Sequence, residues 1–400
     1  MDSATRTYTF SQRAQQLTSS AIREILRVTQ RPEIISFAGG LPSPKGFPVS
    51  QIKEAFDRVL ESEGMSALQY GPTEGYAPLR AWVAEDLKRH GADDISPDEV
   101  LIVSGSQQAL DMLGKLFIDP GSRVLVEAPS YLGALQSFSL FQPEYAAVPT
   151  DAGGLIPESL TDDLAADARF IYVLPNFQNP TGLTLDLARR QALVDRCAEL
   201  GLPIVEDDPY GELRYAGTAQ PSVLGLGRKA GATVVRLGSF SKVLAPGLRL
   251  GYIVAPRPII AKLVQIKQAT DLHTATLSQM AVYETIKDGF LATHLPKVRD
   301  LYKEQCGFML QAMDEHFPQT VTWTRPEGGM FIWVTLPEHI DATELLAKAI
   351  ERNVAFVPGA PFYAGVQGKT NTLRLSFVTV SGDKIRQGIA ILGQLLKEMC

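Results

Sequence analysis

One lysine in the second half of the chain has the setting of an amine nucleophile. Lys242 ends the motif Ser239-Phe240-Ser241-Lys242, which lies in a glycine-bounded loop at 238–251. Short apolar runs at 233–237 and 251–254 flank the loop and predict two buried strands. Lysine is seldom buried, and a lysine held in a tight loop is a candidate for covalent catalysis. The same window also fits a solvated lysine at a surface turn, so the rest of the chain has to decide.

Four further polar segments follow predicted strands or lie within them. Ser106-Gln107 opens a helix after a strand, which suits either a phosphate seat or an ordinary serine cap. The acidic run Glu206-Asp207-Asp208-Pro209-Tyr210 offers a carboxylate to a protonated pyridine nitrogen, or forms a solvated turn. Asn179-Pro180-Thr181-Gly182 offers an amide to a phenolate-like ring oxygen, or is simply a turn. Arg374 suits the capture of a carboxylate, or lies at a strand edge with its head in water.

Strand and helix signals alternate from residue 99 onward. They predict an α/β fold with a mostly parallel central sheet and helices on both faces. Ligands bind at the carboxyl ends of the strands in such sheets, and most of the polar segments above follow a strand. Long helices and a smaller α+β segment close the chain. The expected strands are 100–103, 123–127, 145–148, 170–174, 203–205, 234–237, 249–254, 330–335, 355–357 and 372–377; the expected helices include 106–118, 132–141, 184–200, 258–270, 275–288, 293–316 and 383–397.

These signals divide the chain into three parts. Residues 1–45 form an N-terminal arm, with a helix expected at 20–28 and the loop Gly39-Gly40-Leu41-Pro42 after it. Residues 46–288 form a large domain that holds most of the polar segments. Residues 289–400 form a small C-terminal domain, which contributes Arg374.

The composition is that of an ordinary globular protein and argues against several partners. A net charge of −6 and a pI near 5.5 argue against a nucleic-acid groove or an anionic membrane surface. No apolar run approaches a membrane span, and the N-terminus lacks the apolar core of a signal peptide. Cys197, Cys306 and Cys400 are far apart and odd in number, which fits thiols in a reducing cytoplasm. The five histidines include no pair at metal-ligand spacing, so we expect no metal site.

In their order and spacing, these motifs resemble those of fold-type I pyridoxal-phosphate (PLP) aminotransferases of the class I/II group. The resemblance extends from Gly39 to Arg374, nearly the whole chain. Within the group, the chain closely resembles the branch that contains 2-aminoadipate and kynurenine aminotransferases. The motifs of the branch are Ser20, Arg23, Gly39-Gly40-Leu41-Pro42 and Gln69-Tyr70-Gly71-Pro72-Thr73-Glu74-Gly75; those of the wider group are Ser106-Gln107, Pro129-Ser130-Tyr131, Asn179-Pro180-Thr181-Gly182, Asp207-Asp208-Pro209-Tyr210, Ser239-Phe240-Ser241-Lys242 with Arg249, and Arg374.

The resemblance implies PLP as the cofactor, bound by the large domain. Lys242 would bond PLP covalently and carry a proton between the substrate Cα and the cofactor, for which its pKa must fall below about 10.4. Asp207 would pair with the ring nitrogen and keep the ring an electron sink. The other implied contacts are Asn179 and Tyr210 with the ring's 3′ oxygen, Tyr131 stacked on the ring, and Ser106, Gln107, Ser239, Arg249 and, from the neighbouring subunit, Tyr70 with the phosphate.

The resemblance also implies how substrate binds. Arg374 would bind the α-carboxylate, and Gly40 would let the arm pass close over the amino acid. Arg23, on the arm helix, would pair with a distal carboxylate such as that of glutamate or 2-aminoadipate; an exposed helix arginine is the alternative. The implied substrate-binding residues are Arg374, Asn179, Gly40, Arg23, Ser20 and Tyr70.

On this resemblance we expect a cytoplasmic aminotransferase that moves an amino group between 2-aminoadipate, or other amino acids, and 2-oxoglutarate. Its pathway would be lysine biosynthesis through aminoadipate. It would act as a homodimer with shared active sites, and we expect neither a nucleic acid nor a membrane as a partner. A broad branched-chain or aromatic aminotransferase, or a kynurenine aminotransferase, of the same branch is the alternative. The effector domain of a PLP-binding transcription regulator is a remote alternative, because such proteins need a basic DNA-binding domain ahead of the cofactor fold.

Overall fold

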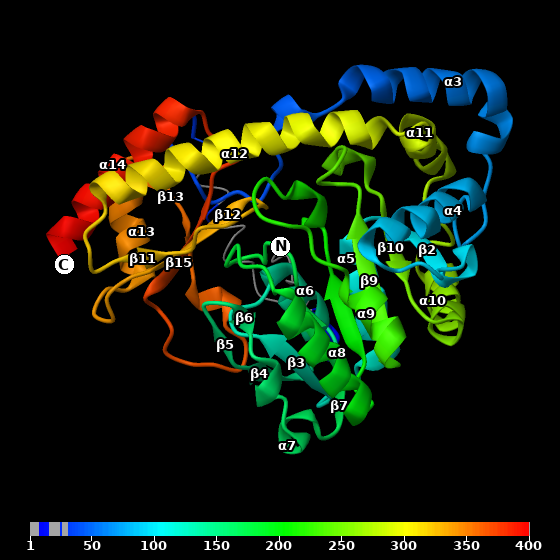
Figure 1. The fold of residues 1–400 in the computed structure, drawn as a ribbon, viewed down its shortest axis with the longest axis horizontal. Coiled ribbons are helices and arrows are strands. Elements are labelled where there is room, and N and C mark those ends of the chain that lie inside the picture. Colours follow the sequence, from blue (N-terminus) through cyan, green and yellow to red (C-terminus); the bar gives the residue numbers. More distant parts are fainter. Residues whose placement is uncertain (1–7, 16–24, 26–30, 400) are drawn as a thin grey trace, which may run out of the picture.

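The computed structural model describes residues 8–15, 25 and 31–399, and a seven-stranded sheet forms its centre (Figure 1). In spatial order its strands are β2 (Val100–Val103), β10 (Gly251–Val254), β9 (Val234–Ser239), β8 (Ile204–Asp207), β7 (Ala168–Val173), β3 (Arg123–Glu127) and β4 (Glu144–Val148). β10 runs antiparallel to both of its neighbours, and the other neighbouring pairs are parallel. The predicted α/β fold with a mostly parallel sheet is therefore confirmed.

Helices cover both faces of this sheet, which explains why most residues of its strands are apolar. Alternate residues along a strand belong to two separate cores: Leu101 and Val103 to one, Val100 and Ile102 to the other. The first core includes residues of α5 (Ser106–Phe117), α6 (Leu132–Ser139) and α10 (Arg257–Thr270); the second includes residues of α4 (Ala77–Asp86), α8 (Leu187–Leu200) and α9 (Val223–Ala230).

The C-terminal part has a four-stranded sheet of its own. Its strands, in spatial order, are β11 (Thr322–Trp323), β12 (Phe331–Thr335), β15 (Thr372–Ser376) and β14 (Val357–Pro358). The long helix α12 (Phe290–His316) runs along the top of Figure 1 towards this sheet, and α14 (Gly382–Met399) lies beside it. α13 (Ala342–Glu351) completes this part. A parallel pair of β1 (Ile35–Ser36) and β13 (Val354–Ala355) joins the arm to it.

Shorter elements and one helix pair complete the fold. α3 (Val49–Ala67) and α11 (Thr276–Ile286) pack together at the end of the molecule opposite α14 (Figure 1). Their contact buries Val59 against Met280. The remaining elements include α1 (Gln12–Gln15), α7 (Asp162–Ala165), β5 (Thr150–Asp151) and β6 (Gly154–Leu155).

The predicted elements differ from the structure in a few places, each with a local cause. The helix expected from residue 184 begins at Leu187, because the Asp186 side chain accepts a hydrogen bond from the Arg189 amide at 2.8 Å and caps it. The strand expected at 355–357 is divided between β13 and β14, which pair in different sheets. Neither α9 nor α13 was predicted from the sequence.

Two expectations about the chain's organisation are not settled by the fold. The helix expected at 20–28 lies outside the described residues except for Ile25. The boundary expected at 288–289 falls at the turn between α11 and α12, and the division into three parts stays a prediction.

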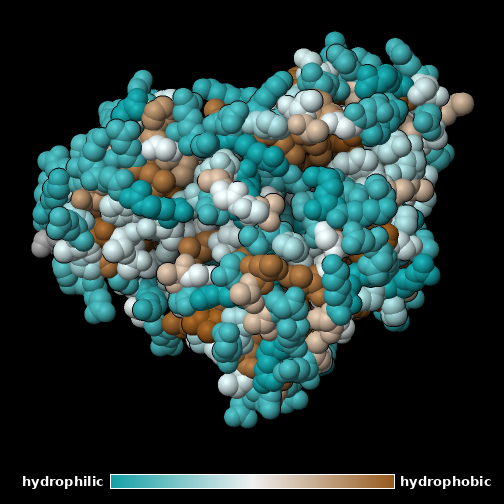
Figure 2. All heavy atoms as spheres, in the orientation of Figure 1, coloured by the Kyte–Doolittle hydropathy of each residue, from teal (hydrophilic) through white to brown (hydrophobic). Residues whose placement is uncertain are grey.

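Within residues 8–15, 25 and 31–399, no helix combines the length and the apolar character that crossing a membrane requires. Hydrophilic residues cover most of the face shown in Figure 2, and its apolar patches are separated from one another.

Candidate active site

A cavity of about 460 Å³ opens where several strands of the central sheet end. β7, β8 and β9 each deliver a lining residue at or just after their carboxyl ends, as expected for a parallel sheet. The predicted site residues that line it are Gly40, Ser106, Gln107, Tyr131, Asn179, Asp207, Tyr210, Ser239, Lys242, Arg249 and Arg374.

Lys242 reaches this cavity from the turn that follows β9. Its Nζ donates a hydrogen bond to the carbonyl oxygen of Gly40 at 3.0 Å and lies 5.9 Å from the centre of the Tyr210 ring. Burial, followed by the positive charges of Arg374 and Arg249, lowers the pKa of Lys242 to about 8. A lowered pKa leaves more neutral amine at neutral pH, which a nucleophile or a proton acceptor requires. The interpretation as a solvated surface lysine is wrong.

The three acids at the end of β8 are buried, so the interpretation as a solvated turn is also wrong. Asp207 is 2% exposed, Glu206 is fully buried, and the Asp208 side chain is 4% exposed. Burial is the main cause that raises the pKa of Asp207 to about 7. Its Oδ1 has no hydrogen-bond partner among the described residues, so a buried acceptor is free for a ligand.

The start of α5 forms an anion-binding corner of the cavity. Gly105 precedes the helix with φ of +83°, and a Cβ there would lie 2.6 Å from Nη2 of Arg249. Arg249 itself has φ of +53°, which is uncommon for a residue with a side chain. Its Nη2 donates to the Ser104 carbonyl at 3.3 Å. Free amides at a helix start and an adjacent guanidinium together suit a phosphate group.

Arg374 lies on β15, between β12 and β14, and is 2% exposed, so it is not a strand-edge arginine with a solvated head. Nη1 donates to Oδ1 of Asn179 at 2.7 Å, and Nη2 donates to the Ala38 carbonyl at 2.9 Å. Its Nε has no partner, and no carboxylate of the described residues pairs with it. A buried guanidinium that lacks a counter-charge suits the capture of a substrate carboxylate.

Two tyrosines supply aromatic surface to the cavity. A Cβ at Gly133 would lie 2.4 Å from Cζ of Tyr131, so the absence of a side chain there makes room for this ring. Tyr210 accepts a hydrogen bond from Nδ2 of Asn179 at 3.4 Å. Burial raises the pKa of both phenols, which therefore stay protonated at neutral pH. The cavity thus offers a flat stacking surface and a hydroxyl donor.

One predicted residue, Tyr70, is not brought to this cavity. Tyr70 is 78% exposed, and its ring packs edge to face on His273, with the ring centres 5.7 Å apart. Tyr70 does not line the cavity of its own chain. This is the position expected of a residue that contacts the site of a neighbouring subunit. Ser20 and Arg23 lie outside the described residues.

Two buried side chains beside the cavity were not predicted from the sequence. Tyr172 donates from Oη to Oδ2 of Asp207 at 2.6 Å. Arg236 binds Oε1 of Glu206 at 2.6 Å and Oδ2 of Asp208 at 2.7 Å. Arg236 is visible in the sequence as a single charge inside an apolar strand. Tyr172 carries no such signal, because aromatic residues are common in strands.

Replacement of Arg236 by methionine is expected to lower the free energy of unfolding by about 3–5 kcal/mol, because two buried carboxylates lose their cation. Urea unfolding of the apo-protein followed by circular dichroism measures the change. Arg257→Met is the matched control, since that side chain is 67% exposed and its ion pair with Asp98 spans 3.6 Å. A loss as small as the control's would contradict the role of Arg236.

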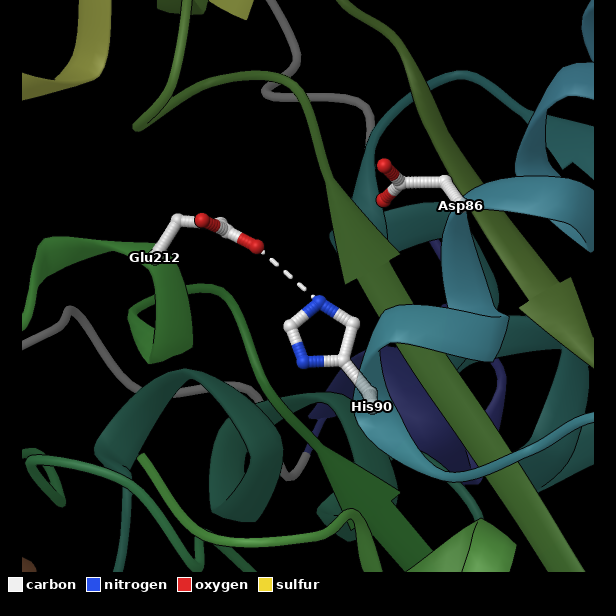
Figure 3. A group of neighbouring side chains, drawn as sticks. All are labelled: Asp86, His90 and Glu212. Carbon is white, nitrogen blue, oxygen red and sulfur yellow. Dashed lines mark ion pairs between the residues drawn. The ribbon is translucent and has the colours of Figure 1, made fainter. Parts of the chain in front are cut away.

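A second cluster of titratable groups, none of which lines the cavity, lies where the end of α4 and the 3-10 helix Leu87–His90 meet the 3-10 helix Gly211–Leu213. Figure 3 shows His90 facing Glu212, with Asp86 nearby; their ligand atoms lie within 4.8 Å of one another. Arginines form ion pairs with both carboxylates: Arg89 pairs with Asp86, and Arg299 binds Oε2 of Glu212 at 2.9 Å. Although burial opposes it, the contact with His90 and the neighbouring charges lower the pKa of Glu212 to about 2. The cluster therefore ties α4 to α12 through internal ion pairs.

The residues of the cavity fit PLP. The anion-binding corner suits the phosphate, and the unpartnered Oδ1 of Asp207 suits a protonated ring nitrogen. Lys242 provides the amine that a covalent bond to the cofactor requires, and Tyr131 provides a stacking surface. The residue that would bind a substrate carboxylate, Arg374, lines the same cavity.

Comparisons with known proteins agree with this fit. The profile of the family "Aminotransferase class I and II" matches residues 33–392. A 2-aminoadipate transaminase of Thermus thermophilus is 49% identical over 97% of this chain and 96% of its own length. The solved structure of the alpha-aminoadipate aminotransferase LysN from Thermus thermophilus, complexed with N-(5'-phosphopyridoxyl)-L-leucine, has a TM-score of 0.89 at 48% identity, covering 98% of this chain and 97% of its own. A Pyrococcus horikoshii kynurenine aminotransferase structure has a TM-score of 0.92 at 43% identity, with the same coverage of both chains. The chain therefore belongs to the class I and II aminotransferases, and its cofactor is pyridoxal 5′-phosphate.

Proposed function

We propose that this enzyme moves an amino group between 2-aminoadipate and 2-oxoglutarate, in lysine biosynthesis through aminoadipate, where glutamate is the amino donor and 2-aminoadipate the product. The choice of substrate rests on the 49% identity with a 2-aminoadipate transaminase, which extends over nearly the full length of both chains. We place the enzyme in the cytoplasm, because the buried thiols Cys197 and Cys306 are unpaired, as is usual in a reducing compartment.

We assign the chemistry to side chains that line the cavity. When bound, PLP supplies an electron sink that weakens the Cα–H bond of an amino acid. Lys242 takes that proton on Nζ, because its lowered pKa keeps a neutral fraction available. Asp207 offers Oδ1 to the ring nitrogen, whose positive charge it stabilises. The remaining assignments are Ser106, Gln107, Ser239 and Arg249 to the phosphate, Asn179 and Tyr210 to the ring's 3′ oxygen, and Tyr131 to the ring face.

Two carboxylates of 2-aminoadipate need two cationic partners. Arg374 binds the α-carboxylate, and Asn179 orients the guanidinium of Arg374 through a hydrogen bond. Gly40 has no side chain, so the backbone of the arm can lie close to the bound amino acid. Among the described residues that line the cavity, the other cations are Lys242 and Arg249, and each has another task. The distal carboxylate therefore requires a cation from elsewhere, which favours Arg23, with Ser20 as its neighbour on the arm.

We further propose a homodimer in which Tyr70 reaches the phosphate and substrate of the neighbouring subunit. The exposure of Tyr70 supports this assignment. Large apolar side chains near it are exposed as well: Met65 is 94% and Leu68 71% exposed. A second copy of the chain would cover them. Sedimentation should give a particle of twice 43.6 kDa, and a monomer would contradict shared sites.

Donor specificity tests the substrate assignment. Steady-state kinetics with 2-oxoglutarate should give the highest kcat/KM for 2-aminoadipate, compared with leucine, phenylalanine, kynurenine and aspartate.

Arg23→Ala is expected to lower kcat/KM for 2-aminoadipate and glutamate about 10-fold or more, because one charge-assisted contact is lost. Turnover of leucine should be unaffected. Arg31→Ala, at an exposed arginine within the same arm, is the control. Wild-type kcat/KM for the acidic donors would exclude Arg23 as the residue that reads the distal carboxylate.

A kynurenine or broad aromatic aminotransferase is the second candidate. It is supported by the 43% identity and the TM-score of 0.92 with the Pyrococcus horikoshii kynurenine aminotransferase. Both candidates share the α-carboxylate and cofactor contacts, so only the partner of the distal side chain separates them. A higher kcat/KM for kynurenine or phenylalanine than for 2-aminoadipate would favour the second candidate.

A further inference from the structure

The two oxygens of the Asp207 carboxylate have different surroundings. Oδ2 accepts a hydrogen bond from Oη of Tyr172 at 2.6 Å. Oδ1 is buried and has no partner among the described residues. Since the side chain lines the cavity, Oδ1 is the oxygen that remains for a ligand.

Tyr172 is held firmly in the position that this contact needs. It lies fully buried on β7, and it pairs in register with Val205 of β8, two residues before Asp207. Its ring packs edge to face with that of Phe138 on α6, with the ring centres 5.7 Å apart. Burial, followed by the charge of Asp207, raises the pKa of Tyr172 well above its usual value. The phenol is therefore a hydrogen-bond donor at neutral pH.

No cation of the described residues contacts Asp207. The guanidinium of Arg236 is instead bound to Glu206 and Asp208. The phenol of Tyr172 is the side-chain donor that the described residues provide to this carboxylate. A buried carboxylate without a partner tends to take up a proton, and a neutral carboxyl stabilises a cationic ring N–H less well. The hydrogen bond from Tyr172 opposes that protonation, because it stabilises the ionised form and so lowers the pKa of Asp207.

We propose that Tyr172 is a positioning residue for the cofactor: it holds Oδ2 of Asp207, so that an ionised carboxylate presents Oδ1 to the ring nitrogen of PLP. The proposal rests on the assignment of Asp207 to that nitrogen, made above. Tyr172 itself does not line the cavity. Its effect is on the protonation of the ring nitrogen, and hence on the strength of the electron sink.

Tyr172→Phe removes the hydroxyl and keeps the ring. In holoenzyme loaded with PLP labelled with ¹⁵N in the ring, the nitrogen resonance should move from the protonated towards the neutral position. The Kd for PLP should rise about 10-fold, as the loss of one hydrogen bond to a charged group predicts. Tyr145→Phe is the matched control, because its phenol donates to the Leu135 carbonyl at 2.7 Å and Tyr145 does not line the cavity. An unchanged resonance and Kd in Tyr172→Phe, or an equal change in the control, would overturn the proposal.

Asp207→Asn tests the role of Tyr172 separately from the assignment of Asp207 to the ring nitrogen, on which that role rests. If Asp207 is the partner of the ring nitrogen, Asp207→Asn alone shifts the resonance, and adding Tyr172→Phe then changes the Kd little further. A wild-type resonance in Asp207→Asn refutes the assignment itself. A shift in Asp207→Asn combined with none in Tyr172→Phe refutes the role of Tyr172 alone.

Should Tyr172→Phe not fold, 3-fluorotyrosine can replace Tyr172. This residue keeps the ring and the hydroxyl, and its hydroxyl is a stronger hydrogen-bond donor. It should raise the pH at which the ring nitrogen loses its proton, and an unchanged pH contradicts the proposal.

Discussion

Lys242→Ala is expected to abolish the visible absorption of the enzyme-bound cofactor and to reduce transamination by at least about 10²- to 10⁴-fold, the usual contribution of a positioned acid–base group. The reason is that Lys242 is the one amine that lines the described cavity. The substitution changes neither the anion-binding corner nor Asp207, so PLP should still bind without a covalent bond. Absorption spectra and single-turnover kinetics on the PLP-loaded variant measure both effects.

Lys262→Ala is the matched control for this substitution. Lys262 is exposed on α10, and its Nζ donates a hydrogen bond to Oε1 of Gln265 at 3.2 Å. It should retain both the spectrum and the rate. Removal of a half-buried amine with a lowered pKa should not destabilise the apo-protein. Retention of the wild-type visible band in Lys242→Ala would refute the assignment of the covalent bond to Lys242.

Arg374→Met is expected to lower kcat/KM for every amino donor by about 30- to 4,000-fold, because truncation of one partner of a buried charge pair costs about 2–5 kcal/mol. The loss should be independent of the donor's side chain, since every amino acid has an α-carboxylate. Arg374→Lys should recover only part of it, because a lysine cannot bind a carboxylate with two parallel hydrogen bonds. Steady-state kinetics with 2-aminoadipate and leucine test both statements.

The same variant should stay folded, with a stability close to that of the wild type. The Cζ atom of Arg374 lies 4.3 Å and 5.3 Å from the ring centres of Phe331 and Phe362, and burial lowers the pKa of Arg374 to about 10. A methionine would remove a buried charge that has no counter-ion, and this gain opposes the loss of the hydrogen bonds to Asn179 and to the Ala38 carbonyl. Arg386→Met is the control: Arg386 also lies over a ring, that of Phe308 at 4.6 Å, but half of its side chain is exposed. A donor-selective loss in Arg374→Met would argue that Arg374 contacts the side chain of the substrate instead.

The order of strands and helices and the mostly parallel sheet were predictable from the sequence, whereas the antiparallel direction of β10 was not. Short apolar runs bounded by glycine or proline mark β2, β3, β7 and β9, because strands that are covered on both faces consist mostly of apolar residues. The same pattern does not predict the direction of β10. That direction depends on the connection between Lys242 and β10. α9 was missed because its eight residues contain two glycines, which count against a helix.

The candidate site was predictable where a motif lies within one segment, and unpredictable where a contact crosses strands. Ser106, Asp207 and Lys242 each stand at the end of a strand, so the fold brings them together without further information. The contact from Tyr172 to Asp207 depends on the pairing of β7 with β8, and that of Arg236 with Glu206 on the pairing of β8 with β9. Register between strands follows from the whole sheet and not from local sequence.

The cavity holds charges that no residue of the described chain neutralises: a carboxylate at Asp207 without a cation, and a guanidinium at Arg374 without an anion. Ligands supply what is missing, so occupancy and folding are thermodynamically linked. A ligand present at 100 times its Kd adds about 2.7 kcal/mol to stability. The empty chain is correspondingly the form that unfolds first and is exposed to proteases. The abundance of this enzyme in a cell should therefore track the supply of vitamin B6, independently of any control over its synthesis.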